Sequence, residues 1–562
     1  MRYSFYLLFF IGIGLLLLSN CASISQPTGG PKDTIPPVLE LSIPINGSLN
    51  YRGTTFQLKF DEYVKVDKLR QELIITPKYD GNVKAKVNRN TIALELDKKL
   101  DDSTTYTFTF REGIKDITES NAPVNLSLAF STGDYIDSIF IEGKVNDLMT
   151  NKEMEDILVG LYPIDDTVFL FDGAPTYFTK TDEEGYFRIN NIKVDRYLIT
   201  ANQDENSNLI NDSDKESYGY LSDTLNLDVS LSDLSIKLLR LDVRPIRLLN
   251  SRPSGKYFEA KYNKHIKEYV INTEDSMITN LVEDGKTIRF YPNLMTLDSL
   301  ELIIDVSDSV GLQSTDTLMV KFEETKRDFD KFNLSISLEE NSKLNENIEF
   351  TFSFNKPIEK LNLDSIFFQY DSTHVFPLDS NHLVWNKNKD LVNVRIKLDS
   401  TLYFDLKQVK DTTTILEDNP EQVRRKTRSA GSSGFKFVAG PGTFISVDND
   451  TSRLVIRNVT FKKRDLLGSI SGTITTKYKS YTVQLVDKKF NVKAELINPV
   501  NYSFKEIDPG KYFIRVLIDT NENGIWEKGN ILKGLEPEDI YFYEKELPVR
   551  ANWEINGEDF SF

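Results

Sequence analysis

Two segments of the chain carry oxygen-bearing side chains at alternate positions, a spacing typical of loops that bind calcium. They are ANQDENSNLINDSD (Ala201 to Asp214) and LIDTNENGIWEKGN (Leu517 to Asn530). Calcium takes about six to eight oxygen ligands, and one loop can supply them from its first, third, fifth, seventh and ninth positions. These positions hold Asp204, Asn206, Asn208, Ile210 and Asp212 in the first loop and Asp519, Asn521, Asn523, Ile525 and Glu527 in the second. The isoleucines would contribute backbone carbonyls.

The loops also depart from an EF-hand. The glutamate of its twelfth position is replaced by Lys215 in the first loop and by Asn530 in the second. Asp214 or Glu216 would substitute in the first loop, whereas the second has no equally near acid. With two carboxylates and two amides for each site, we expect a structural calcium ion of modest affinity, about 10⁻⁴–10⁻³ M.

A plain turn is the competing interpretation of both loops. Asn and Asp tolerate left-handed backbone and cap their own turns, and Asn523-Gly524 is a strong hairpin signal. The sequence therefore allows two interpretations: each loop is stiffened by a bound ion, or each loop is held by hydrogen bonds alone.

The residues upstream of the two loops are also in register, at a constant offset of 315. Each segment has the outline of a transthyretin-like, carboxypeptidase-regulatory-like β-sandwich and begins near a glycine-containing strand, at Gly143 and Gly472. The chain therefore contains an internal repeat. The matching pairs are Ile189 and Phe504, Ile192 and Ile507, Arg196 and Lys511, and Tyr197 and Tyr512.

Apolar residues alternate along many short segments, as in TFQLKF, TIALEL and TYTFTF, where every second residue is apolar or aromatic. Such alternation, separated by short turn-rich gaps, is typical of half-buried strands in sandwiches. No sustained helical period is present. The sequence predicts an all-β protein of tandem β-sandwich domains, with few and short helices.

The only cysteine, Cys21, follows an apolar run from Phe5 to Leu18. That run has the length of a signal peptide and is shorter than the roughly 20 residues of a membrane span. We expect cleavage before Cys21 and lipidation of this residue, which leaves no disulfide. The Ser-, Gly- and Pro-rich residues after it predict a flexible tether.

The segment from Pro27 to Val64 resembles the opening of Ig-like lipoproteins of Bacteroidota, whose first module is an SbsA-type Ig-like domain. The resemblance is carried by PTGGPKD (27–33), the Pro36-Pro37 pair and FDEYV (60–64). It implies a non-enzymatic protein anchored to the outer membrane.

These patterns predict seven segments. They are a signal peptide (1–20), a lipidated Cys and tether (21–37), an SbsA-type Ig-like domain (38–134), a transthyretin-like sandwich (135–242), an Ig-like β domain (243–326), a second Ig-like domain (327–464) and a second transthyretin-like sandwich (465–562).

The first and the last Ig-like segments also show a weaker sequence similarity to each other. Phe60 matches Phe354, and AFSTG (129–133) matches KFVAG (436–440) at a larger offset, so the second copy holds an insertion. We place it at EDNPEQVRRKTRSAGSSG (417–434). This basic segment is either a solvated loop or an arm that docks on an acidic partner.

Composition restricts the function. The net charge of −17 argues against nucleic-acid binding and suits divalent cations. The chain has only three histidines and one cysteine, so it has few residues for the commoner enzyme mechanisms. The segment GSISG (468–472) resembles a nucleophile elbow but has Ile470 at the position of the serine. We therefore expect no enzyme.

The sequence thus predicts a lipid-anchored scaffold or accessory subunit of an outer-membrane β-barrel complex, for example in protein assembly or export. The alternative is a surface binding or adhesion module for polysaccharide or protein, using Trp385, Trp526 or Trp553; a hydrolase is the third possibility. Because no acid follows Cys21 closely, we favour the periplasmic face of the membrane over the cell surface.

Overall fold

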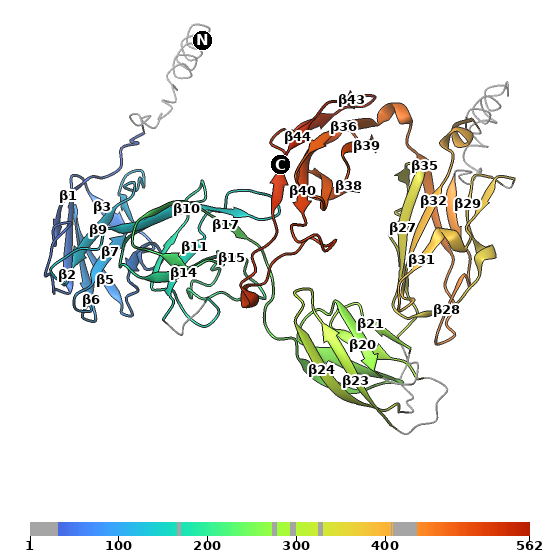
Figure 1. The fold of residues 1–562 in the computed structure, drawn as a ribbon, viewed down its shortest axis with the longest axis horizontal. Coiled ribbons are helices and arrows are strands. Elements are labelled where there is room, and N and C mark those ends of the chain that lie inside the picture. Colours follow the sequence, from blue (N-terminus) through green and yellow to red (C-terminus); the bar gives the residue numbers. More distant parts are fainter. Residues whose placement is uncertain are drawn as a thin grey trace, which may run out of the picture.

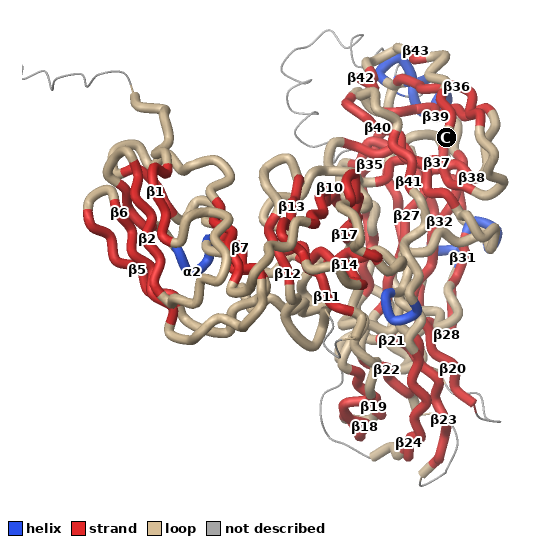
Figure 2. Tube along the Cα trace, turned by 60° about the vertical axis from the view of Figure 1, so that its left-hand side comes forward, coloured by secondary structure: helices blue, strands red, loops and turns tan. Residues whose placement is uncertain are grey.

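The computed structural model describes residues 32–165, 170–272, 278–292, 299–323, 330–371, 373–405, 407 and 435–562. Within these ranges the chain is built almost entirely of β-strands, which confirms the all-β prediction (Figure 2). Helix is confined to short pieces, and no helix in the described ranges is long and apolar enough to cross a membrane. The short pieces are α2 (Leu69–Glu72), residues 400–405, η1 (Leu363–Ser365), η2 (Ser380–His382), η3 (Arg464–Leu466) and η4 (Ile531–Lys533).

The strands form five β-sandwich units, numbered 1 to 5 along the chain (Figure 1). Unit 1 packs the sheet β1-β2-β6-β5 against β4-β7-β9, with β3-β8 as a two-stranded ribbon. Phe56, Leu58 and Phe60 are fully buried, as the alternation in TFQLKF predicts. Its strands are β1 (Leu39–Ile43), β2 (Thr55–Phe60), β3 (Val64–Val66), β4 (Ile74–Thr76), β5 (Val83–Asn88), β6 (Thr91–Leu96), β7 (Thr105–Thr109), β8 (Ile114–Asp116) and β9 (Ser127–Ser131).

Unit 2 consists of the sheets β13-β10-β17 and β12-β11-β14-β15, with β16 also paired to β14. Its first strand runs parallel to its last, β17. Its strands are β10 (Ile139–Asp147), β11 (Leu158–Pro163), β12 (Tyr177–Lys180), β13 (Tyr186–Ile192), β14 (Arg196–Asn202), β15 (Tyr218–Tyr220), β16 (Leu225–Asn226) and β17 (Leu231–Leu238).

Unit 5 has the same strand order as unit 2, with β39-β36-β43 in one sheet and β38-β37-β40-β41 in the other. The first strand is again parallel to the last strands. The internal repeat seen in the sequence is therefore a repeat of topology. The strands are β36 (Gly468–Thr475), β37 (Tyr481–Asp487), β38 (Val492–Ile497), β39 (Asn501–Ile507), β40 (Gly510–Ile518), β41 (Ile540–Phe542), β42 (Leu547–Val549), β43 (Glu554–Ile555) and β44 (Phe560–Ser561).

The glycines that open the two repeats have a steric role. A Cβ added at Gly143 in β10 would lie 2.1 Å from the carbonyl oxygen of Leu234, and one at Gly472 in β36 would lie 2.3 Å from that of Glu558. In both units the neighbouring segment of the chain passes too close for a side chain, so only glycine fits.

Unit 3 consists of the sheets β18-β19-β22-β21 and β20-β23-β24, around a core that includes Phe258, Tyr262, Phe290 and Ile304. Its strands are β18 (Leu248–Ser254), β19 (Tyr257–Tyr262), β20 (Glu268–Asn272), β21 (Thr279–Leu281), β22 (Thr287–Phe290), β23 (Leu300–Ser307) and β24 (Gln313–Val320).

Unit 4 repeats the plan of unit 1, because β25-β27-β32-β31 corresponds to β1-β2-β6-β5 and β28-β34 to β3-β8. Its other sheet is β26-β35-β33-β29-β30. The strands are β25 (Leu334–Ile336), β26 (Ser342–Leu344), β27 (Asn347–Phe354), β28 (Ile358–Leu361), β29 (Ile366–Gln369), β30 (Val375–Pro377), β31 (Leu383–Trp385), β32 (Leu391–Lys397), β33 (Lys436–Ala439), β34 (Phe444–Ser446) and β35 (Val455–Phe461).

This topology corrects one predicted match. Because β29-β33-β35 corresponds to β4-β7-β9, the strand of KFVAG takes the place of β7, whereas AFSTG forms β9. The match of these two segments is therefore wrong; alternation alone could not tell two aromatic strands of one sheet apart. Most of the additional residues of unit 4 lie between β32 and β33, the connection in which the insertion was predicted.

Units 2 to 5 make contacts around a closed ring, and unit 1 projects from it (Figure 1). Consecutive units are joined by polar contacts, and the ring is closed between the repeats, from unit 5 to unit 2. The contacts include Lys264 Nζ to the carbonyl of Asp242 (3.0 Å), Lys256 to Asp448 (2.7 Å), Asn345 Nδ2 to the carbonyl of Glu506 (3.4 Å) and Arg515 Nη1 to the carbonyl of Met149 (2.6 Å).

The glycine in β10 gives a first prediction. Gly143→Ala should lower the free energy of unfolding of unit 2 by about 1–3 kcal/mol, because β10 or the segment at Leu234 must shift to admit the methyl group. Lys144→Ala, at an exposed neighbouring position, is the control and should change stability by less than about 1 kcal/mol. Denaturant unfolding measures both; equal effects would contradict the steric role.

Candidate functional site

Loop 1 (residues 204–216) connects β14 to β15, and its alternating side chains turn back onto the loop backbone. The Asp204 carboxylate accepts hydrogen bonds from the backbone N–H groups of Asn208 and Leu209, each at 3.0 Å. Asn206 Oδ1 also accepts from the N–H of Asn208, and its amide Nδ2 donates to the Asp212 carboxylate at 2.8 Å. The first, third and ninth positions are thereby brought together.

Loop 2 (residues 519–538) connects β40 to β41 and repeats this arrangement. The Asp519 carboxylate accepts from the N–H groups of Asn523 (3.1 Å) and Gly524 (2.7 Å), and Asn521 Nδ2 donates to Glu527 at 2.8 Å. Gly524, the sixth residue of the loop, has φ +86°. A residue that permits a sharp turn is needed at this position of a calcium loop.

The fifth and seventh positions also behave alike in the two loops. Asn208 Oδ1 accepts from the N–H of Ile210 at 2.7 Å, and Asn523 Oδ1 accepts from the N–H of Ile525 at 2.8 Å. Leu209 occupies the sixth position of loop 1 with φ 63°. The two loops thus share one backbone path despite different residues at this position.

A buried glutamate closes each loop. Glu216 accepts from the N–H groups of Glu205 (3.0 Å) and Asp212 (2.9 Å), and it is 2% exposed. Glu538, 8% exposed, accepts from the N–H groups of Thr520 and Glu527, both at 2.8 Å. The two glutamates therefore occupy the same place in the repeat.

Sequence reasoning named Glu216 as a substitute ligand but missed Glu538. Loop 2 is seven residues longer, so the matching acid does not fall at the offset of 315. An alignment anchored on the next strand, where Glu216 and Glu538 each stand two residues before β15 and β41, would have found it.

The electrostatics of loop 1 favour a cation. Burial raises the pKa of Glu216, the carboxylates of Asp204 and Asp212 raise it further, and the backbone N–H donors lower it. In loop 2, hydrogen bonds from Ser480 and from the loop N–H groups hold the pKa of Asp519 below its ordinary value.

No three histidine, cysteine, aspartate or glutamate side chains in the described ranges converge closely enough to hold a metal ion. A calcium ion in either loop would therefore depend on amide and carbonyl oxygens as well, and on displacing hydrogen bonds such as that between Asn206 and Asp212. The residues present supply oxygen donors of the types that calcium takes.

Loop 2 also forms a clasp, by which we mean the contact of residues 528–538 with unit 2. Ile531 is buried in an apolar cluster with Tyr218, Tyr220, Leu239 and Leu241 of unit 2 or its C-terminal end. The Tyr220 hydroxyl donates to the carbonyl of Leu535, and the N–H and hydroxyl of Ser222 donate to Glu536 at 2.6 and 2.8 Å. The residues that lengthen loop 2 are those that reach the other repeat.

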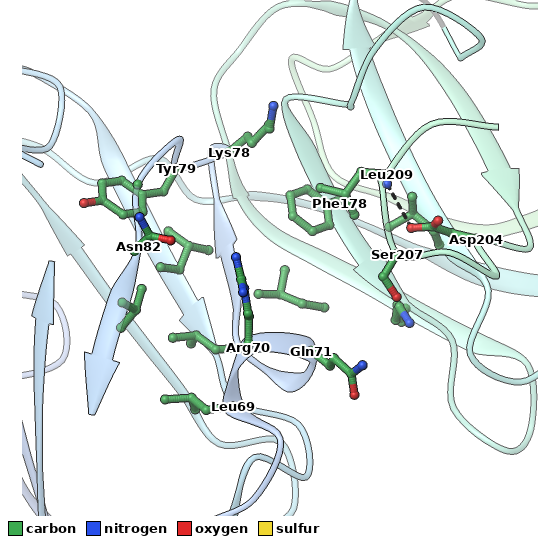
Figure 3. Close-up of a pocket in the computed structure, with 17 residues that line it drawn as sticks. Leu69, Arg70, Gln71, Lys78, Tyr79, Asn82, Phe178, Asp204, Ser207 and Leu209 are labelled. Carbon is green, nitrogen blue, oxygen red and sulfur yellow. Dashed lines mark hydrogen bonds between the residues drawn. The ribbon is translucent and has the colours of Figure 1, made fainter. Parts of the chain in front are cut away.

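Loop 1 lines a pocket of about 420 Å³ between units 1 and 2 (Figure 3). On the side of unit 1, α2 contributes Arg70 and the β4–β5 connection contributes Tyr79. On the side of unit 2, Phe178 of β12 and Leu209 of loop 1 face them.

The remaining sequence candidates have different outcomes. Cys21 and the basic segment at 417–434 lie outside the described residues. Trp385 stacks on Phe354 at 6.0 Å and Trp526 packs against the clasp cluster, so both belong to apolar cores. Trp553 is 51% exposed, with the guanidinium of Arg550 over its ring at 4.7 Å.

Comparison with known families gives one match. Residues 33–132 match the bacterial Ig-like domain, which confirms an Ig-like domain at unit 1. No curated protein matches the chain.

Several solved structures resemble the chain at low sequence identity and low TM-score. One is the N-terminal part of the S-layer protein SbsC, which is 14% identical and matches over 31% of this chain and 42% of that chain, with a TM-score of 0.14. A second is BcpA, the major pilin subunit of Bacillus cereus, which is 10% identical and matches over 76% of this chain and 99% of that chain, with a TM-score of 0.14. A third is the SGBP-B protein of a mixed-linkage glucan utilization locus of Bacteroides ovatus, in complex with a mixed-linkage heptasaccharide. It is 10% identical and matches over 67% of this chain and 88% of that chain, with a TM-score of 0.14. The chain spans less than half of the SbsC fragment.

The clasp gives a second prediction. Ile531→Ala should weaken the contact of units 5 and 2 by about 2–4 kcal/mol through lost apolar burial and the resulting cavity, and open the ring. Small-angle X-ray scattering should then report a larger radius of gyration. Leu532→Ala, whose side chain is 56% exposed, is the matched control and should leave the scattering curve unchanged. Identical curves for both variants and the unmodified chain would contradict the clasp.

Proposed function

We propose that the chain is a non-enzymatic scaffold, lipid-anchored at Cys21 to the periplasmic face of the outer membrane and serving as an accessory subunit of a β-barrel protein complex. The family match to a bacterial Ig-like domain and the all-β architecture support a non-enzymatic surface or binding protein. The resemblance to Bacteroidota lipoproteins supports the anchor.

The observation that carries this proposal is the closed ring of units 2 to 5. Tandem domains joined by single linkers move independently unless their interfaces are large or apolar. Here the clasp adds an apolar cluster and several hydrogen bonds between units far apart in the sequence, and Arg515 adds a hydrogen bond to the carbonyl of Met149. Such a ring holds its outer loops and sheet edges at fixed positions, as a scaffold requires.

Calcium is the second part of the proposal. An ion in each of the two loops would stiffen the corners from which the pocket wall and the clasp extend. The ligands would be Asp204, Asn206, Asn208, the carbonyl of Ile210, Asp212 and Glu216 in loop 1, and Asp519, Asn521, Asn523, the carbonyl of Ile525, Glu527 and Glu538 in loop 2.

A surface binder is the second candidate function, and the exposed Trp553 favours it. An aromatic face at the surface is a platform on which a sugar ring or a protein side chain can stack. Glycan-array binding that is lost in Trp553→Ala would support this candidate over the scaffold.

The anchor and the partner are tested together. A tagged chain purified in gentle detergent should bring along a stoichiometric integral β-barrel protein, identified by mass spectrometry. Cys21→Ala should move the chain from the membrane fraction to the soluble fraction, because acyl chains supply the membrane affinity.

Recovery of the chain alone, under conditions that preserve other membrane complexes, would contradict the scaffold. Cleavage of the chain by protease added to intact cells would contradict the periplasmic orientation.

For calcium, about 10 mM of the ion should raise the free energy of unfolding by about 1–3 kcal/mol for each bound ion, given an affinity of about 10⁻⁴–10⁻³ M. The raised pKa of Glu216 means that its charge costs stability once the pH rises through that pKa, and calcium offsets this cost. The calcium effect on thermal unfolding should therefore grow as the pH rises from about 4 to 7.

The variant Asp212→Asn/Glu527→Gln removes one carboxylate from each loop and should lose most of the calcium effect. Glu205→Gln/Glu522→Gln, at non-ligand positions of the same loops, is the matched control and should keep it. The calcium proposal would be contradicted if calcium stabilised both variants equally, or if it did not stabilise the unmodified chain. Both loops would then be held by hydrogen bonds alone.

A further inference from the structure

The cleft between units 1 and 2 has opposite charge at its two ends. The pocket of about 420 Å³ carries cationic Arg70 and Lys78 on the side of unit 1. A second compartment of about 290 Å³ shares Gln71, Lys180, Asp204 and Ser207 with it, so the two are adjacent. This second compartment is lined by the acids Glu72, Glu155, Asp156 and Glu205.

Some of these charges are neutralised within the protein. Arg111 lies 3.6 Å from Glu72 and 3.0 Å from Asp156, and Lys180 lies 2.9 Å from Asp156. Lys78 pairs with Asp80 at 3.0 Å.

Other charges are left for a ligand. Across the described ranges, the side chains of Arg70, Glu155 and Glu205 make no ion pair or hydrogen bond, and all three residues are exposed. Arg70 extends from α2 into the space between the two units (Figure 3). The cleft therefore offers one free cation in its first compartment and two free carboxylates in its second.

One part of the wall of the first compartment is apolar. Leu158, Ile74 and Ile75 are almost fully buried beneath it, and the half-buried side chains of Phe178 and Leu209 contribute to its surface. A ligand bound beside Arg70 would therefore also contact an apolar surface.

The cleft is preformed, because contacts hold its two sides together. The N–H of Lys78 donates to the carbonyl of Thr176 at 2.8 Å, and the Thr107 hydroxyl donates to Asn191 Oδ1 at 3.0 Å. Preformed pockets of a few hundred Å³ at domain interfaces, apolar with a few polar groups, are typical small-ligand sites.

We propose that this cleft binds a short peptide with free termini. The peptide carboxylate pairs with Arg70, the amino terminus pairs with Glu155 and Glu205, and apolar side chains lie on the surface formed by Phe178 and Leu209. A guanidinium matches a carboxylate with two parallel hydrogen bonds. This binding activity goes beyond the scaffold role and depends on neither the anchor nor calcium.

The test uses the full chain and isothermal titration with Ala-Leu peptides of two to five residues with free termini. We expect saturable binding of at least one length. Blocking its carboxylate as an amide, or its amine by acetylation, should each weaken binding by about tenfold or more, because each removes one charge-assisted contact.

Arg70→Gln should weaken binding of the free peptide by about the same factor as blocking the peptide carboxylate does. This variant should bind the free peptide and the peptide amide with equal affinity. Arg52→Gln, at a side chain of unit 1 that is 69% exposed and outside the cleft, is the matched control. Glu155→Gln/Glu205→Gln should remove the preference for the free amine. Because these residues are on the surface, an unchanged thermal midpoint verifies the fold of each variant.

Equal affinity for free and blocked peptides, equal affinity of the Arg70 and Arg52 variants, or no saturable binding of any length at millimolar concentration would each overturn the proposal. None of these outcomes bears on the pull-down or on the calcium titration.

Discussion

The burial of Ile531 against unit 2 is the contact on which the arrangement of the molecule depends. Every other junction of the ring joins units that are neighbours along the chain. Within the described residues, only the contacts of unit 5 with unit 2 connect segments more than three hundred residues apart: Tyr220 with Leu535 in the clasp, and Met149 with Arg515 outside it. Because apolar burial is not directional, the hydrogen bonds around Ile531 give this contact its register.

The clasp is built from a duplicated corner. Loops 1 and 2 have the same first, third and fifth residues, an acid at the ninth position (Asp212 and Glu527) and the same closing glutamate, so the same loop structure occurs twice. In loop 2 the added residues lie between Glu527 and Glu538. The N–H of Glu538 donates to the carbonyl of Glu527 at 3.0 Å, so both ends of the extension are held by the corner itself. The corner thus positions the residues that reach the other repeat, while in unit 2 the shorter loop lines the cleft with unit 1.

The sequence predicts local features well, because side-chain alternation and turn chemistry act over a few residues. Phe56, Leu58 and Phe60 are buried as alternation requires, and the loop side chains converge as their spacing indicates. The pairing of strands is harder to predict from the sequence. KFVAG and AFSTG have the same pattern, yet they form different strands of the sheet, and only the pairing partners distinguish them. Glu538 and Ile531 escaped prediction for a related reason: their roles are set by an insertion and by a distant unit, which no local pattern reports.

The closed ring can be tested in the cell, because the chain has a single cysteine, Cys21, and the described residues have none. The most direct measurement is the bridging of Ser222→Cys and Glu536→Cys by a short bifunctional thiol reagent, because the native side chains at these positions are in hydrogen-bonding contact across the clasp. The account predicts that the reagent cross-links this pair within one chain as efficiently as it cross-links a cysteine pair placed across two neighbouring strands of unit 5. No cross-link between 222 and 536, with the control pair fully formed, would show that the repeats do not pack together and would contradict the account.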